Sequence, residues 1–236
     1  MDVVYILGTH SRWQDNEIRY SLRSLQKHMA DLRNVFVVGE HPDWLQNVTH
    51  IPMPDGYGLR WKNAYTKTLA ACQHPDLSDE FLFMNDDFYM TEPFVGAEWP
   101  YYHKGSLGVA KIGNRLVRGT SGHTTYSLLQ SLKKPTANFQ MHCPLRYEKQ
   151  KYIDMPISAK EPGIISPRSF YCNFYEIPGT LTKEFFMFGR VSVPSMLSLA
   201  KRAPWFSSLN ATVTNKEFEQ FINILYPEPS RFEKAA

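Results

Sequence analysis

Short apolar runs recur along the first part of the chain. They are rich in β-branched and aromatic residues, and two of them end at Gly8 and Gly39. Such runs are typical of strands that are buried on both faces of a sheet. The pattern therefore predicts strands at residues 2–7, 34–39, 48–51 and 80–85.

Two amphipathic segments lie between these runs. A first helix is predicted to begin after Asp15, its N-cap, because apolar residues follow at spacings of four, three and four. These residues are Ile18, Leu22, Leu25 and Met29. A second helical stripe consists of Trp61, Tyr65, Leu69 and Cys72. Strands that alternate with helices predict βαβ units, and hence an α/β fold with a mostly parallel sheet.

The polar segments that follow the strands indicate where ligands would bind. In parallel sheets, ligands lie beyond the carboxyl ends of the strands. Residues 8–13, 39–43 and 85–87 are expected to meet there. This convergence directs the search for chemistry to three short segments.

The chain changes character after residue 92. Prolines interrupt the pattern repeatedly, so we expect a loop-rich second half packed on the sheet. One late helix is predicted before Pro227, because apolar residues follow helical spacing there. These residues are Phe218, Phe221, Ile222 and Leu225.

The composition agrees with one large domain. The 236 residues are 43% hydrophobic and 14% aromatic, which is enough for a sizeable core. The formal net charge of +3 is too small to argue for a nucleic-acid partner and only permits anionic substrates. The three cysteines have no metal-ligand or disulfide spacing, which indicates a reducing compartment. Without a signal-like start or a long apolar run, we expect a cytoplasmic protein with no stable membrane insertion.

Asp86 and Asp87 are the sharpest local feature. They stand together at the end of an apolar strand, where carboxylates are costly to desolvate unless they hold a metal ion, another cation or a substrate hydroxyl. Transferases of the GT-A type carry an acidic pair at such a strand end to bind a divalent ion, and residues 85–87 look like that arrangement. The alternative is a strand-terminal turn in which Asp86 only caps the backbone.

A charged cluster at the start of the first helix is the second candidate. Glu17 lies beside the helix start, and Arg19 and Arg23 lie one turn apart on one face. Arginines near the crevice suit bidentate recognition of phosphate. The alternative is a solvated helix face with internal ion pairs.

Several motifs, in order along the chain, closely resemble the Stealth family. Its members are sugar-phosphate transferases of bacterial capsule synthesis and include the animal lysosomal-enzyme N-acetylglucosamine-phosphotransferase. The second family block is matched by residues 16–24, 33–39, 42–45 and 81–88. The third block, centred on a His followed by a Pro, is similar to residues 141–144. The fourth is similar to residues 205–210, 217–218 and 226–233.

The chain departs from the family pattern at two positions. The first block normally follows its strand with an acidic residue, and residues 6–13 contain none. In the fourth block an Asp usually follows the Asn, and here Ala211 follows Asn210. These departures concern the contacts to the donor and the metal.

The resemblance implies a GT-A-like fold in a single transferase domain over residues 1–236. Residues 1–92 would form the nucleotide-sugar-binding half, and residues 93–236 the acceptor-side half. The donor would be a sugar nucleotide, with Asp86 and Asp87 holding a divalent metal such as Mg or Mn. The reaction would move sugar-1-phosphate onto an acceptor hydroxyl and leave a nucleoside monophosphate.

The resemblance also suggests roles for single residues. His142 is the candidate base, because an imidazole titrates near neutral pH and can accept the proton of the acceptor hydroxyl. Glu17 and Asp87 are the other candidate catalytic residues. The candidates for binding the donor and its phosphates are Arg19, Arg23, Arg168 and Asn210.

Two other functions stay open. One is true glycosyl transfer, in which the bond from sugar C1 to oxygen breaks and a nucleoside diphosphate leaves. The acceptor could then be a glycan precursor, a lipid-linked sugar or, less favoured, a modified nucleic-acid base. The other is a non-catalytic module that binds a glycan or a nucleotide, against which the presence of Glu17, Asp87 and His142 argues.

Overall fold

The structure is a computed structural model, and it describes most of the chain. The described residues are 1–9, 11–108, 111–112, 115–116, 121–160, 165–187, 189 and 191–235. No side-chain environment is described for residues 109–120 or for Asn210.

A five-stranded sheet forms the centre of the molecule, in the order β3-β2-β1-β4-β9. Four of its strands are parallel: β1 (Asp2–Leu7), β2 (Val35–Gly39), β3 (Thr49–Ile51) and β4 (Glu80–Met84). The strand β9 (Leu145–Glu148) pairs antiparallel with β4 at the edge. The predicted strands and the mostly parallel sheet are confirmed.

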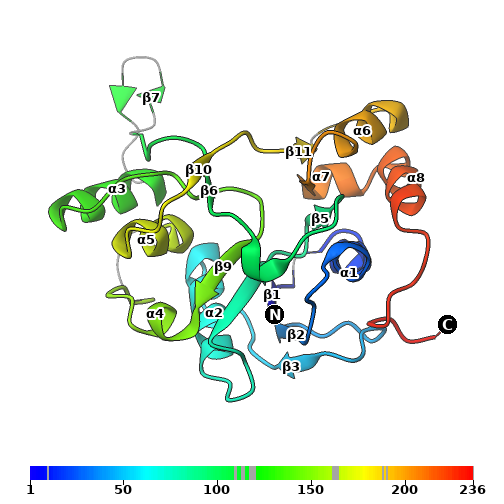
Figure 1. Cartoon of the computed structure of the whole chain (residues 1–236), viewed down its shortest axis with the longest axis horizontal. Helices are drawn as coiled ribbons and strands as arrows, with labels where there is room; N and C mark the ends of the chain where they lie inside the picture. Colours follow the sequence, from blue (N-terminus) through cyan, green and yellow to red (C-terminus); the bar gives the residue numbers. More distant parts are fainter. Residues whose placement is uncertain are drawn as a thin grey trace.

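Helices cover both faces of this sheet (Figure 1). Val3, Tyr5 and Leu7 pack on the side of α1 (Asn16–His28), and Val4 packs on the side of α2 (Arg60–Cys72). Alternate residues of one strand point to opposite faces, so a strand that is apolar throughout needs cover on both. This is why the continuous apolar runs of the sequence become central strands.

The second half adds elements on both sides of the sheet. On one side lie α3 (Ser121–Ser131), α4 (Lys149–Ile153) and α5 (Pro167–Phe174); on the other lie α6 (Val193–Ala200), α7 (Asn210–Val213) and α8 (Lys216–Leu225) (Figure 1). A three-stranded sheet has the order β11-β12-β5. Its strands are β11 (Phe186–Met187), β12 (Trp205–Ser208) and β5 (Phe88–Met90). The remaining short elements are β6 (Tyr102–His103), β7 (Lys111–Ile112), β8 (Arg115–Leu116), β10 (Thr180–Leu181) and the 3-10 turn η1 (Gly96–Glu98).

This half is more regular than the sequence pattern predicts. The late helix is confirmed as α8, but α5 and α6 were not anticipated. Both begin with a proline in their first turn, Pro167 and Pro194. Proline is well tolerated at a helix start, where its missing N–H has no partner to lose. These two prolines start helices rather than interrupting them.

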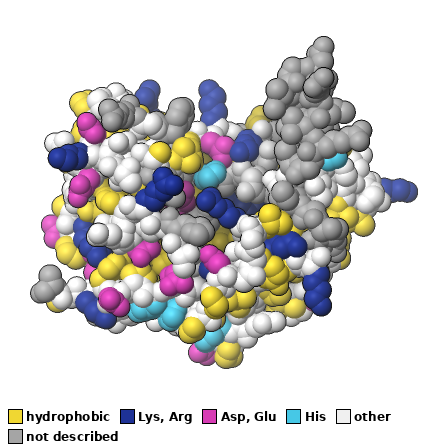
Figure 2. All heavy atoms as spheres, turned by 180° about the vertical axis from the view of Figure 1, so that it is seen from behind, with side chains coloured by type: hydrophobic (Ala, Val, Ile, Leu, Met, Phe, Trp, Pro, Cys, Tyr) yellow, Lys and Arg dark blue, Asp and Glu magenta, His cyan; other side chains and the backbone are white. Residues whose placement is uncertain are grey.

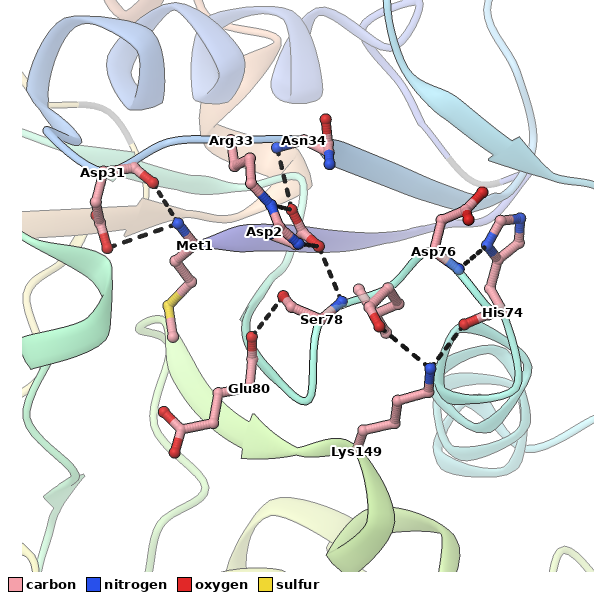
Figure 3. Close-up of polar contacts among 11 residues, drawn as sticks. Met1, Asp2, Asp31, Arg33, Asn34, His74, Asp76, Ser78, Glu80 and Lys149 are labelled. Atoms are coloured by element: carbon pink, nitrogen blue, oxygen red, sulfur yellow. Dashed lines mark hydrogen bonds and ion pairs between the residues drawn. The ribbon is translucent and has the colours of Figure 1, made fainter.

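The amino end of β1 is fixed by a buried carboxylate (Figure 3). Asp2 is fully buried and accepts two hydrogen bonds from the Arg33 guanidinium, at 2.8 and 2.7 Å. It also accepts the backbone N–H groups of Asn34 and Ser78, at 3.2 and 2.9 Å. One side chain thereby joins the starts of β1, β2 and β4 at the edge of the sheet opposite to the expected crevice.

The surface carries both signs of charge. Figure 2 shows acidic and basic side chains interspersed on the face opposite to that of Figure 1. The described side chains of this face therefore form no continuous basic surface. Of the described helices, none combines the length and the apolar character that a membrane crossing requires.

Candidate active site

A cavity of about 290 Å³ lies at the carboxyl ends of β1 and β2. Its wall includes Gly8, Ser11 and Asp15 from the segment after β1, and Glu40 and His41 from the segment after β2. We call this cavity the crevice. The two segments converge as the sequence predicts, whereas residues 85–87 are not part of its lining.

Ser11 organises the turn that leads into α1. Its hydroxyl donates to Glu17 Oε2 at 2.8 Å and accepts the backbone N–H of Asp15 at 2.8 Å. Asp15 occupies the predicted N-cap position, but its side chain makes no capping hydrogen bond and its backbone is left-handed, with φ of 57°. Ser11 thus shapes the turn that precedes α1, and the Asp15 carboxylate lines the crevice.

Four carboxylates gather beside this turn. Burial raises the pKa of Asp86 well above its usual value, and the charges of Asp87, Glu17 and Asp15 raise it further. Burial also raises the pKa of Glu17, which is only 2% exposed. The charges of Asp15 and Asp87 raise this pKa a little further. Mutual repulsion of this kind is relieved when a cation or a proton is bound. We call these four residues the acidic cluster.

His142 reaches the acidic cluster from the second half of the chain. Its Nδ1 lies 3.8 Å from Asp87 Oδ2, and its side chain is 40% exposed. Its backbone is held on both sides, because its N–H donates to Glu184 Oε1 at 2.9 Å and its carbonyl accepts Trp205 Nε1 at 3.0 Å. The structure thus brings together four of the predicted site residues, Glu17, Asp86, Asp87 and His142.

Arg19 and Arg23 face the C-terminal segment of the chain. Arg23 forms a fork with Glu233, with Nε–Oε1 and Nη2–Oε2 distances of 2.8 and 2.7 Å. Arg19 lies 3.7 Å from the same carboxylate through its Nε, and its guanidinium carbon lies 4.4 Å from the centre of the Trp44 ring. Neither arginine lines the crevice. Their role in donor binding stays a prediction.

Arg168 and Asn210 complete the predicted donor set. Arg168 is buried on α5 and donates from Nη2 to the Cys143 carbonyl oxygen at 2.5 Å. Its guanidinium carbon also lies 5.9 Å from the centre of the Phe88 ring. It therefore supports the segment that carries His142. Asn210 begins α7, and its side chain lies outside the described residues.

A buried lysine below the crevice escaped the sequence analysis. Lys67 Nζ donates to the Leu7 carbonyl oxygen at 2.7 Å and pairs with Asp55 Oδ1 at 2.7 Å. It is 3% exposed. Gly39, at φ of 121°, makes room for it, because a Cβ there would collide with the Lys67 ammonium and the Leu7 carbonyl. No local sequence signal distinguishes this lysine from a solvated one on the same helix.

A divalent ion at the acidic cluster would need phosphate or water to complete its set of ligands. Among the described residues, no group of three or more His, Cys, Asp or Glu side chains is arranged to hold a metal. Asp87 Oδ1 and Glu17 Oε1 are buried and have no hydrogen-bond partner within this part of the chain. Carboxylates suit Mg²⁺ or Mn²⁺, and Mg²⁺ is often held by one or two carboxylates together with substrate phosphates and water. The unpartnered Asp87 oxygen fits such a shared site, and the predicted role of Asp86 as a metal ligand stays a prediction.

Known relatives match about a third of the chain. A capsular polysaccharide phosphotransferase of Neisseria meningitidis serogroup B is 30% identical over 90 residues, which are 34% of this chain and 24% of that protein. The human N-acetylglucosamine-1-phosphotransferase subunits alpha/beta are 35% identical over 88 residues, 33% of this chain and 7% of that protein. No protein-family model matches the sequence. The match thus spans a quarter or less of these relatives. Over this third of the chain, the resemblance to Stealth phosphotransferases is confirmed.

Solved structures show the fold. An active-site mutant of LgtC, a galactosyltransferase, matches with a TM-score of 0.50 at 11% identity, over 95% of both chains. At this identity the likeness concerns the fold alone. The GT-A-like architecture that the family resemblance implies is therefore confirmed.

Proposed function

We propose that the chain is a sugar-nucleotide-dependent transferase that moves a sugar-1-phosphate onto an acceptor hydroxyl. The observation that carries the proposal is the approach of His142 to Asp87 at the carboxyl edge of a GT-A-like sheet. The similarity to proteins named as phosphotransferases supports this class of reaction over others on the same fold.

His142 would act as the base. We assign the Nδ1 proton to the side that faces Asp87, which leaves Nε2 free to accept the proton of the acceptor hydroxyl. The acceptor oxygen then bonds to the phosphorus that carries the sugar, the phosphoanhydride bond breaks, and a nucleoside monophosphate leaves. Asp87 would hold the imidazole in this orientation and stabilise its charged form. The 3.8 Å separation would shorten on substrate binding, as catalytic contacts often do.

Asp86 and Asp87 would hold the divalent ion. When bound, a cation such as Mg²⁺ or Mn²⁺ neutralises charge on the diphosphate of the donor. The crevice between the ends of β1 and β2 would take the nucleotide, because Glu40 and the backbone near Gly8 offer polar partners there. Arg168 would support the site from behind through the Cys143 carbonyl.

True glycosyl transfer is the second candidate. It is favoured by one observation, the absence from residues 6–13 of the acidic residue that normally follows the first strand in the family and concerns the contacts to the donor. In that reaction the sugar C1–oxygen bond breaks and a nucleoside diphosphate leaves. The acceptor in either reaction would be a glycan or a lipid-linked sugar. The three free, buried cysteines support a reducing, cytoplasmic setting.

The released nucleotide decides between these reactions. The protein is incubated with a panel of sugar nucleotides, Mg²⁺ or Mn²⁺, and glycan acceptors, and the products are separated by chromatography. Nucleoside monophosphate together with a phosphodiester product supports the proposal. Nucleoside diphosphate supports glycosyl transfer. Binding of a sugar nucleotide without any turnover would favour a non-catalytic module.

A further inference from the structure

A second hollow, of about 830 Å³, lies between α1 and the C-terminal segment of residues 227–235. We call it the tail groove. Charged and apolar side chains share its lining, including Arg19, Arg23, Trp44, Pro229, Glu233 and Lys234. This volume lies within the range of about 300–1,000 Å³ that is common for small-molecule sites. The groove is therefore large enough for a ligand of several rings, not only for a single anion.

The wall of the tail groove is fixed by the backbone. Leu45 and Glu233 form an antiparallel bridge. The backbone N–H of Lys234 donates to the Trp44 carbonyl oxygen at 2.8 Å, and that of Gln46 donates to the Phe232 carbonyl oxygen at 2.9 Å. Phe232 is 1% exposed and anchors the segment in the core. The groove is thus a built feature of the fold.

The charges of the tail groove leave positive groups in excess. Both carboxylate oxygens of Glu233 are engaged by the Arg23 fork. Arg19 therefore has only a 3.7 Å contact to this acid, and 30% of its side chain is exposed. Lys234 is exposed and forms no ion pair within the described ranges. Asp43 adds one negative charge to the lining. The lining thus carries one more positive than negative charge.

We propose that the tail groove binds an anionic saccharide, a sugar chain that carries phosphate or carboxylate groups. The Arg19 guanidinium lies over the Trp44 ring on a side chain that is 30% exposed, so it can donate hydrogen bonds to an oxyanion, and Lys234 can add a second charge. The apolar surfaces of Trp44 and Pro229 suit the C–H faces of sugar rings.

The tail groove adjoins the crevice. Asp15 lines the crevice and Arg19, one turn later on α1, lines the groove. In the segment after β2, His41 lines the crevice and Trp44 lines the groove. A sugar chain in the groove would therefore lie beside the proposed nucleotide site. The inference rests on the contacts of the groove and holds whether or not the proposed transfer occurs.

Calorimetric titration with three tetrasaccharides tests the proposal. The probes are a phosphodiester-linked tetramer of N-acetylglucosamine, a hyaluronan tetrasaccharide that carries carboxylates, and neutral chitotetraose. No donor is added, so a failure of the transfer reaction does not affect the result. We expect the anionic probes to bind at least about tenfold more tightly than the neutral one. The tighter of the two identifies the preferred oxyanion. Equal binding of all three probes would overturn the proposal.

Two variants then locate the binding site. Lys234→Met and Arg19→Met should each weaken binding of the preferred anionic probe about tenfold. Arg202→Met, an exposed arginine after α6, is the matched control and should bind as the unmodified protein does. Lys234 is exposed, so its variant folds even if the Arg19 variant does not. If Lys234→Met and every folded Arg19 variant, Arg19→Lys included, bind the probe unchanged, the tail groove is not the site.

Discussion

The imidazole of His142 and the carboxylate of Asp87 lie 3.8 Å apart, although 55 positions separate the two residues in the sequence. Asp87 follows the central strand β4, and His142 precedes the edge strand β9 that pairs with β4. The antiparallel pairing of these two strands brings the histidine back to the end where the acidic pair stands. The edge strand therefore assembles the candidate site.

Asp87→Asn should lower turnover by orders of magnitude and leave the melting temperature almost unchanged. The amide cannot balance the charge that His142 gains on accepting a proton, and it is a poorer ligand for a cation. It nevertheless keeps the shape of the side chain and removes one like charge from the acidic cluster. Steady-state kinetics and thermal unfolding measure the two effects. The exposed Asp76→Asn is the control, and equal losses of activity and stability in Asp87→Asn would make the residue structural.

His142→Ala should lower turnover by about 10²–10⁴-fold while the affinity for the sugar nucleotide stays nearly intact. The reason is that a general base contributes to proton transfer and not to ground-state binding of the donor. Added imidazole should restore part of the activity of the variant, an effect that a purely structural histidine would not produce. A variant that turns over at the full rate would transfer the role of base to Glu17.

The apolar pattern was sufficient to predict the four parallel strands of the sheet and the helices α1 and α2. Strands such as β1 are apolar on both faces, and their length and composition are local signals. The strand β9 was missed because it is only four residues long. In it, the polar Arg146 and Glu148 alternate with the buried Leu145 and Tyr147. Its place in the sheet depends on pairing with β4, which no local pattern encodes.

The site was predictable only in part, for the same reason. The acidic pair and the helix start are local features, and His142 was suggested by the family resemblance. The partner of Arg23 lies 210 positions away, so the fork with Glu233 could not be inferred from the helix face alone. Lys67 was missed because a buried lysine gives the same local pattern as a solvated one until the fold places the Leu7 carbonyl and Asp55 around it.

Glu17→Gln should make the folded protein more stable at neutral pH while it reduces activity. Burial raises the pKa of Glu17, so the folded state binds its proton more tightly than the unfolded state does. The stabilisation from this proton is complete below the unfolded pKa of about 4.3 and is lost as the pH rises through the folded pKa. The neutral amide avoids that loss. Each kcal/mol gained should raise the melting temperature by about 2–4 °C.

The gain of Glu17→Gln should disappear at acidic pH, where the native carboxyl is protonated in both states. Unfolding by urea over a pH series checks this dependence. The exposed Glu92→Gln serves as the control and should show no such trend. A variant that is less stable than the native protein at neutral pH would mean that the Ser11 hydrogen bond outweighs the burial of the charge.

Asp2→Asn should destabilise the fold by about 1–3 kcal/mol, because the charge-assisted bonds to Arg33 and to the Ser78 backbone lose strength in a buried position.

Burial alone would raise the pKa of Asp2, but the hydrogen bonds from Arg33 and Ser78 outweigh it and lower the pKa to about 2. A carboxyl with a lowered folded pKa contributes stability that is present above its unfolded value, about 3.9, and is lost as the pH falls toward 2. The native protein should therefore lose stability in this acid window, and the variant should lose less. Urea unfolding between neutral pH and pH ~2 measures both curves, with the exposed Asp79→Asn as the control. Parallel curves for Asp2→Asn and the native protein would show that other carboxylates govern the acid response.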